Sequence, residues 1–112
     1  MARLNYLELP VRDLGLVKGF YADALGWTFT DFGPSYAATT TGDTDLGLQA
    51  DATEATARPL PVIQVADLEG TLARVEAAGG VVTVPIFSFP GGRRFHFRDP
   101  AGHELAAMQP DG

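Results

Sequence analysis

Apolar residues recur with a helical period in two segments of the chain, and a short strand-like run precedes each segment. They are spaced three or four positions apart, as on one face of an amphipathic helix: Leu14, Val17, Tyr21 and Ala24 in the first segment, and Leu68, Leu72 and Val75 in the second. Short apolar runs follow each segment, separated by turns rich in glycine, proline and aspartate, which is typical of β-strands. We expect these strands at residues 27–32, 35–41 and 46–50, and at residues 80–87, 93–98 and 103–109.

The two halves of the chain repeat each other. An offset of 54 residues, the difference between positions 11 and 65, aligns Val11 with Val65, Asp13 with Asp67, Leu14 with Leu68, and Gly26 with Gly80. Each aspartate precedes its helix, where a carboxylate accepts hydrogen bonds from the free N–H groups of the first turn. The glycines at positions 26, 79 and 80 are natural helix ends. A fixed internal period predicts a repeated structural unit, here βαβββ.

This pattern predicts an α+β fold with helices on one face of largely antiparallel sheets. We expect one domain over residues 1–112, with a first module at about 1–50 and a second at about 60–112. The polar, alanine-rich segment 51–59 between them is interpreted as a linker.

Composition narrows the classes of function. The net charge of −6 and the lack of a basic patch beyond Arg93, Arg94 and Arg98 disfavour nucleic-acid binding. The chain has no cysteine, which excludes disulfides and thiolate sites. It has neither the roughly 18 consecutive apolar residues of a membrane span nor the pattern of a signal peptide at its start, so we expect a cytoplasmic protein that does not enter membranes.

Four stretches together resemble the vicinal oxygen chelate superfamily, which contains glyoxalases, bleomycin-resistance proteins and extradiol dioxygenases. They are LELPVRDL and FYADALGW in the first half, VADLEGTLARVEAAGGVV in the second, and FRDPAGHELAAMQ at the end. The resemblance covers nearly the whole chain. It implies two βαβββ modules whose sheets curl around a shared cavity, with the helices outside. It says less about activity, because one fold hosts many chemistries.

The resemblance also locates the metal ligands of the family's enzymes, which lie on the first and last strands of each module. The corresponding positions here are Tyr6, the stretch 47–49, about Leu60, and Ala106. None of these is a usual ligand for a divalent metal, and Gln49 is a weak one. We therefore expect no resident metal.

The final strand carries His103 and Glu104, both potential metal ligands. Neighbouring side chains on a strand point to opposite faces, so these two cannot hold one ion together. Glu104 shares its face with Ala106 and Met108, the expected cavity face, whereas His103 follows a turn and is expected in water.

His96 alternates with Phe95 and Phe97. If the phenylalanines pack under the helices, His96 and Arg94 face the cavity, and we favour this orientation because large apolar side chains prefer the core. The opposite orientation stays open. An unconventional metal site of Glu8, His96 and Glu104 is the alternative to the metal-free prediction; otherwise the two glutamates lie at solvated strand ends or pair with a cavity arginine.

The leading hypothesis is a metal-free protein that binds a small aromatic or heterocyclic molecule in the cavity between its modules, as bleomycin-resistance proteins do. Tyrosine offers apolar contact with one polar group, and methionine adapts to irregular shapes. Trp27 is expected to fill the core instead. The predicted ligand-binding residues are Tyr6, Glu8, Tyr36, Gln49, Gln64, His96, Glu104 and Met108.

Two alternatives remain. One is a glyoxalase-like lyase or isomerase, which uses either the unconventional metal set or acid–base catalysis without a metal. The other is an accessory domain whose own side chains fill its pocket. The expected partners are a small-molecule ligand and a second copy of the chain, because family members are commonly dimers and exposed sheet edges favour pairing.

Overall fold

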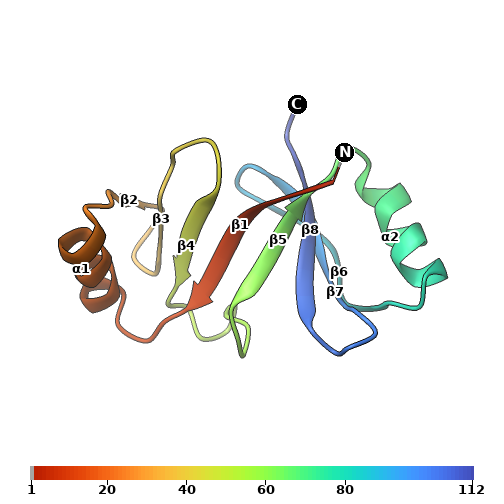
Figure 1. The fold of residues 1–112 in the computed structure, drawn as a ribbon, viewed down its shortest axis with the longest axis horizontal. Helices are drawn as coiled ribbons and strands as arrows, with labels where there is room; N and C mark the ends of the chain where they lie inside the picture. The colour runs from red at the N-terminus through yellow and green to blue at the C-terminus, as the bar shows by residue number, and fades with distance from the viewer. Residues whose placement is uncertain (1) are drawn as a thin grey trace. The chain divides into compact units, whose positions relative to one another are not determined.

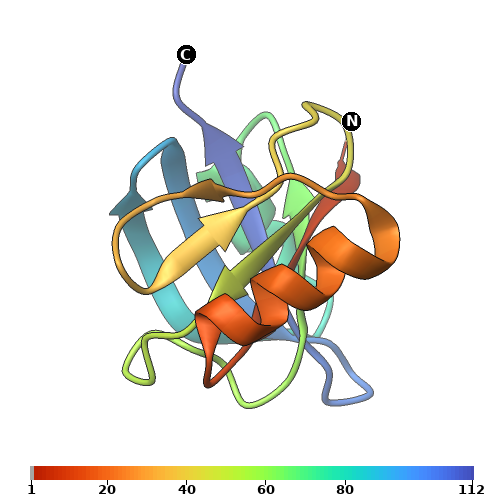
Figure 2. The same cartoon turned by 90° about the vertical axis from the view of Figure 1, so that its left-hand side faces the viewer.

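The computed structural model describes residues 2–112, which divide into two compact units, residues 6–60 and residues 2–5 with 61–112. Figures 1 and 2 show the elements. In chain order they are β1 (Arg3–Pro10), α1 (Leu14–Leu25), β2 (Thr30–Asp31), β3 (Tyr36–Ala38), β4 (Asp45–Gln49), β5 (Leu60–Gln64), α2 (Leu68–Ala77), β6 (Val81–Phe89), β7 (Gly92–Arg98) and β8 (Glu104–Pro110).

Each unit has the βαβββ order that the repeat predicts. In the first unit the strands follow the order β1-β4-β3-β2, and in the second they follow the equivalent order β5-β8-β7-β6. In both, the first strand pairs in parallel with the last, and the remaining pairs are antiparallel. The α+β fold and the doubled module are thus confirmed. The closure of the two sheets around a shared cavity stays a prediction.

The second unit has a well-packed core between α2 and one face of its sheet. Phe95 and Leu68 are fully buried there, next to Val65 and Ala107, and Leu72 and Val75 of α2 pack against this cluster. The helix lies against β6, β7 and β8 (Figure 1). Its predicted apolar face is therefore the face that it buries.

The first unit holds its helix more loosely. Helix α1 lies against β3 and β4 (Figure 2), yet none of its residues is fully buried. Leu14, Val17 and Tyr21 of its predicted apolar face are half-buried, and Ala24 is exposed. Phe20 on the same helix is 62% exposed. The two helices therefore contribute unequally to stability, although their sequences repeat.

The predicted helix signals are confirmed. The carboxylate of Asp13 accepts from the backbone N–H of Leu16 at 3.0 Å, and that of Asp67 accepts from the N–H of Gly70 at 3.1 Å. Helix α1 ends at Gly26, whose φ of 71° is the left-handed conformation that glycine tolerates. The turn before β8 is closed by the carboxylate of Asp99, which accepts from the N–H groups of Ala101 and His103.

The predicted strand over residues 27–32 is mostly wrong. Only Thr30 and Asp31 are in a strand, because its neighbour β3 is three residues long and pairs with just these two. The prediction that Trp27 fills the core is also wrong, because its side chain is 41% exposed. Its indole ring stacks on the ring of Tyr21, with the centroids 5.5 Å apart and the planes at 15°. This contact with α1 replaces the burial that a paired strand would have given.

Across residues 2–112, neither helix is long and apolar enough to cross a lipid bilayer.

Candidate functional site

The predicted ligand-binding residues of the first unit share one face of its sheet. Glu8 of β1 pairs with Gly47 of β4, and Gln49 of β4 pairs with Tyr36 of β3. Tyr6 lies two residues before Glu8 and therefore points to the same side. Leu7 and Leu46, which pair with each other, point to the opposite side, toward α1. The face away from the helix thus carries two phenols and a carboxylate.

These three groups form a hydrogen-bonded chain. The hydroxyl of Tyr36 donates to Oε1 of Glu8 at 2.9 Å, and the hydroxyls of Tyr6 and Tyr36 are 2.6 Å apart. A phenol has one proton, so Tyr36 accepts from Tyr6 while it donates to Glu8. Glu8 is only 2% exposed, which makes this partner important, because a buried carboxylate without hydrogen bonds is costly. The chain fixes the direction of the protons on this face.

The surroundings of Tyr36 keep it protonated. Burial raises the pKa of its phenol well above the usual range, and the nearby carboxylate of Glu8 and the phenol of Tyr6 raise it further. Tyr36 is therefore a neutral hydrogen-bond donor at every physiological pH.

This shift predicts a loss of stability in alkali that depends on Tyr36. Above the ordinary tyrosine pKa of 10.0, the unfolded chain releases this proton and the folded chain retains it, so the free energy of unfolding falls as the pH rises. The limiting slope is about 1.4 kcal/mol per pH unit for one group. We expect Tyr36→Phe to reduce the slope measured by urea unfolding between pH 10 and 11. The same slope in Tyr36→Phe as in the wild type would contradict this assignment.

Two predicted ligand-binding residues are held by the fold. Oε1 of Gln49 accepts from the N–H of Asp51 at 3.0 Å, which anchors the segment after β4. Oε1 of Gln64 accepts from Nδ2 of Asn5 at 2.8 Å and so joins β5 to the start of β1. Both side chains are half-buried and act first as structural links.

The second unit presents a different polar face. Phe95 and Phe97 pack toward α2, which places Arg94 and His96 on the other side of β7, the orientation favoured from the sequence. His96 pairs with Ala106 and Arg94 pairs with Met108, so these side chains share a face with Glu104. His103 is exposed, as predicted.

His96 and Glu104 are in direct contact. Nδ1 of His96 lies 3.2 Å from Oε2 of Glu104, and the hydroxyl of Thr83 donates to the same oxygen at 3.1 Å. His96 is 4% exposed. A carboxylate at this nitrogen orients the ring and directs its other nitrogen, Nε2, away from the pair. The sequence analysis named both residues as candidates but not their partner Thr83, which lies on β6, 21 positions before Glu104.

Arg94 lies over two aromatic rings of β6. Its guanidinium carbon lies 5.2 Å from the ring centroid of Phe87 and 5.5 Å from that of Phe89. Phe87 also lies 5.8 Å from the ring of His96. The alternation of Phe87 and Phe89 on β6 was the available sequence signal for this aromatic contact.

The positions that carry metal ligands in the family do not fit a metal here. A side chain on Gly47 would clash with the hydroxyls of Tyr6 and Tyr36 and would lie 2.7 Å from Cζ of Tyr6, so the two phenols fill the space that a ligand at 47 would need. Leu60 and Ala106 are fully buried and have no donor atoms in their side chains. The donor set at these positions therefore has one phenol and neither imidazole nor carboxylate.

The alternative metal set is divided between the two units. Glu8 contacts Tyr36 in the first, whereas His96 and Glu104 contact each other in the second. Among residues 2–112, no three histidine, aspartate or glutamate side chains lie together as metal ligands would.

Comparison with known families identifies the family of the chain. Residues 3–107 match the model of the Glyoxalase/Bleomycin resistance protein/Dioxygenase superfamily. The chain belongs to this superfamily. The resemblance of its four sequence stretches is thus confirmed. A comparison with curated proteins returns no match.

Solved structures share the fold at low sequence identity. Methylmalonyl-CoA epimerase from Mycobacterium tuberculosis is 16% identical with a TM-score of 0.76, over 98% of this chain and 89% of that one. A superfamily member from Vibrio splendidus 12B01 is 17% identical with a TM-score of 0.68, over 99% and 100%. The Mn(II)-bound glyoxalase from Novosphingobium aromaticivorans is 21% identical with a TM-score of 0.70, over 97% of this chain and 40% of that one. At these identities the similarity establishes the fold, and the activity has to be argued from the site.

Proposed function

We propose that this protein binds a small aromatic or heterocyclic molecule without a resident metal, in the manner of sequestering members of the superfamily. The observation that carries the proposal is the chain from Tyr6 through Tyr36 to Glu8: Tyr6 stands at a metal-ligand position of the family, and the two phenols close position 47 to any side chain. A site with phenols where the family's enzymes hold a metal keeps aromatic surface and directed hydrogen bonds, which are what an organic ring requires.

The polar groups define the complementary features of the ligand. Because Tyr36 donates to Glu8 and accepts from Tyr6, the Tyr6 oxygen is oriented as a hydrogen-bond acceptor. A ring that carries an N–H or O–H donor therefore fits this face better than a ring with acceptors alone.

A thermal-shift screen of aromatic and heterocyclic compounds in EDTA tests the proposal. A compound present at 100 times its dissociation constant stabilises the folded state by about 2.7 kcal/mol, which gives a clear rise in the melting temperature. We expect hits whose shift is reduced several-fold by Tyr6→Phe and retained by Tyr21→Phe, the matched phenol on α1. A library without hits, or hits that require an added divalent metal, would contradict the proposal.

A second candidate function is acid–base catalysis, favoured by the buried His96 held by Glu104 at 3.2 Å. A buried imidazole oriented by a carboxylate is a common general base. Methylmalonyl-CoA epimerase is among the structural relatives, so its named substrate is a suitable probe. Incorporation of deuterium from D2O into methylmalonyl-CoA, lost in His96→Asn, would support an enzyme; exchange no faster than in buffer would leave binding as the function.

The homodimer and the cytoplasmic location stay predictions. Strands β2 and β6 stand at the two ends of the strand order. Each has one edge that pairs with no other described strand, and another chain can pair there. Sedimentation equilibrium measures the oligomeric state directly, and a mass of 11.9 kDa at all concentrations would reject the dimer.

A further inference from the structure

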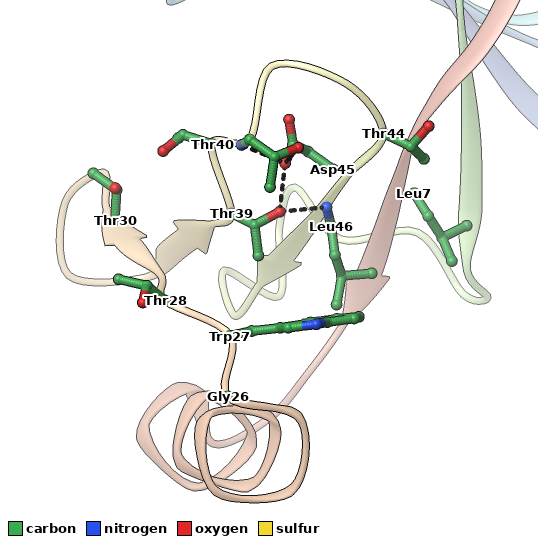
Figure 3. Close-up of a pocket in the computed structure, with 11 residues that line it drawn as sticks. Leu7, Gly26, Trp27, Thr28, Thr30, Thr39, Thr40, Thr44, Asp45 and Leu46 are labelled. Carbon is green, nitrogen blue, oxygen red and sulfur yellow. Dashed lines mark hydrogen bonds between the residues drawn. The ribbon is translucent and has the colours of Figure 1, made fainter.

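A pocket of about 710 Å³ opens on the helix side of the first unit, opposite the face of Tyr6 and Glu8. Its volume lies within the roughly 300–1,000 Å³ typical of small-molecule sites. Figure 3 shows the residues that line it. They come from the end of α1, from β2 and the segment before it, from β4 and the loop between β3 and β4, and from β1: Leu7, Gly26, Trp27, Thr28, Thr30, Thr39, Thr40, Thr41, Thr44, Asp45 and Leu46.

The indole of Trp27 provides one wall of this pocket and is held in place from behind. One face of the ring stacks on Tyr21 of α1. The other side meets the pocket, where Figure 3 shows the side chains of Leu46 and Thr39 above the ring. The stack on Tyr21 fixes the orientation of the indole ring. Its other face is therefore preorganised to stack on one more flat ring.

The loop that forms the opposite wall is closed by Asp45. Its Oδ1 accepts from the hydroxyls of Thr39 and Thr41 at 2.7 and 2.9 Å, and its Oδ2 accepts from the N–H of Gly42 at 3.1 Å. Burial alone would raise the pKa of Asp45, but these hydrogen bonds outweigh it and lower the pKa. The carboxylate is thus ionised and already engaged by donors from its own loop, so it does not select for a cation.

The remaining polar groups of the lining are neutral. Thr28, Thr30, Thr40 and Thr44 are exposed and present hydroxyls, which both donate and accept hydrogen bonds. Among the residues that the structure describes, no lysine, arginine or histidine lines the pocket. An anion therefore finds no counter-charge, whereas a neutral ring with polar atoms at its edge meets hydroxyls there and apolar surface on its faces.

We propose that this pocket is a second binding site, which takes a neutral planar heteroaromatic molecule stacked on Trp27. It is separate from the proposed function, because Leu7 and Leu46, which line it, point to the opposite side of β1 and β4 from Tyr6 and Glu8.

Caffeine, a neutral planar heteroaromatic compound, is the probe. Trp27 is the only tryptophan in the chain, so its fluorescence reports the pocket directly. We expect saturable quenching with half-saturation on the order of 1 mM, the affinity of a small fragment. Amide shifts in a ¹⁵N NMR titration should concentrate at Thr39 and Leu46. Trp27→Leu should weaken binding, measured by these shifts, by about 2- to 10-fold, the worth of one aromatic stack.

A control variant separates this site from other contacts. Phe32→Leu removes an aromatic side chain that is 54% exposed outside the pocket, and it should leave the caffeine affinity unchanged. Quenching that rises linearly, as for N-acetyltryptophanamide, would overturn the proposal. So would shifts at Glu8 and Gly47 instead of Thr39 and Leu46, which would support the proposed function alone. Saturation by methyl glucoside but not by caffeine would reject the planar class of ligand.

Discussion

Replacement of Phe95 by alanine should lower the free energy of unfolding by about 3–5 kcal/mol, the usual cost of removing a buried phenylalanine. Phe95 is fully buried, with 0% of its surface exposed to water, and it packs with Leu68, Val65 and Ala107 under α2. The substitution removes apolar contacts and leaves a cavity that strands β7 and β8 cannot close. Urea unfolding followed by far-UV circular dichroism measures the effect.

Phe20→Ala is the matched control, because Phe20 lies on α1 and is 62% exposed. Its effect should be within about 0.5 kcal/mol, as for surface substitutions in general. Equal costs for the two substitutions would show that Phe20 is buried as completely as Phe95, in conflict with its exposure.

Replacement of Gly47 by alanine should cost about 1–3 kcal/mol through overpacking. The added methyl group would clash with the hydroxyls of Tyr6 and Tyr36, and both phenols would have to leave their hydrogen-bonded positions beside Glu8. The same variant should lose ligand shifts in the thermal screen. Gly47 thus connects stability with binding.

Two comparisons identify the phenols as the cause. Gly19→Ala, in α1, has no atom within 4 Å of the added methyl group and should stabilise the helix by up to about 1 kcal/mol. In a Tyr6→Ala, Tyr36→Phe background, the cost of Gly47→Ala should fall, because the obstructing groups are smaller. The same cost in both backgrounds would mean that the backbone of β4, and not the phenols, excludes a side chain at position 47.

The local features of the fold were predictable from the sequence because each depends on neighbours in the chain. Asp13 and Asp67 cap helices through N–H groups three residues away, and Asp99 closes a turn of four residues. The strand at 27–32 was overpredicted because its length depends on β3, which has only three residues to offer as partners.

The candidate site was predictable only in part. Strand alternation predicted that Tyr6 and Glu8 share one face of β1 and that His96 lies opposite Phe95 and Phe97 on β7, and the structure has both arrangements. It gave no information on the contact between Glu8 and Tyr36, which are 28 positions apart, because side-chain partners across strands depend on register and chain path. The role of Trp27 was missed for a similar reason, since its exposure follows from how closely α1 packs on the sheet.

A ¹⁵N NMR titration of metal-free protein with aromatic and heterocyclic fragments tests the central claim most directly. The claim predicts that at least one fragment with an N–H or O–H donor shifts the amides of Glu8 and Gly47 in a saturable way. The shifts should be the same in EDTA and in the presence of Zn²⁺ or Mn²⁺. If these amides respond to no fragment, or respond only after a metal is added, the phenol-lined face is not a metal-free binding site.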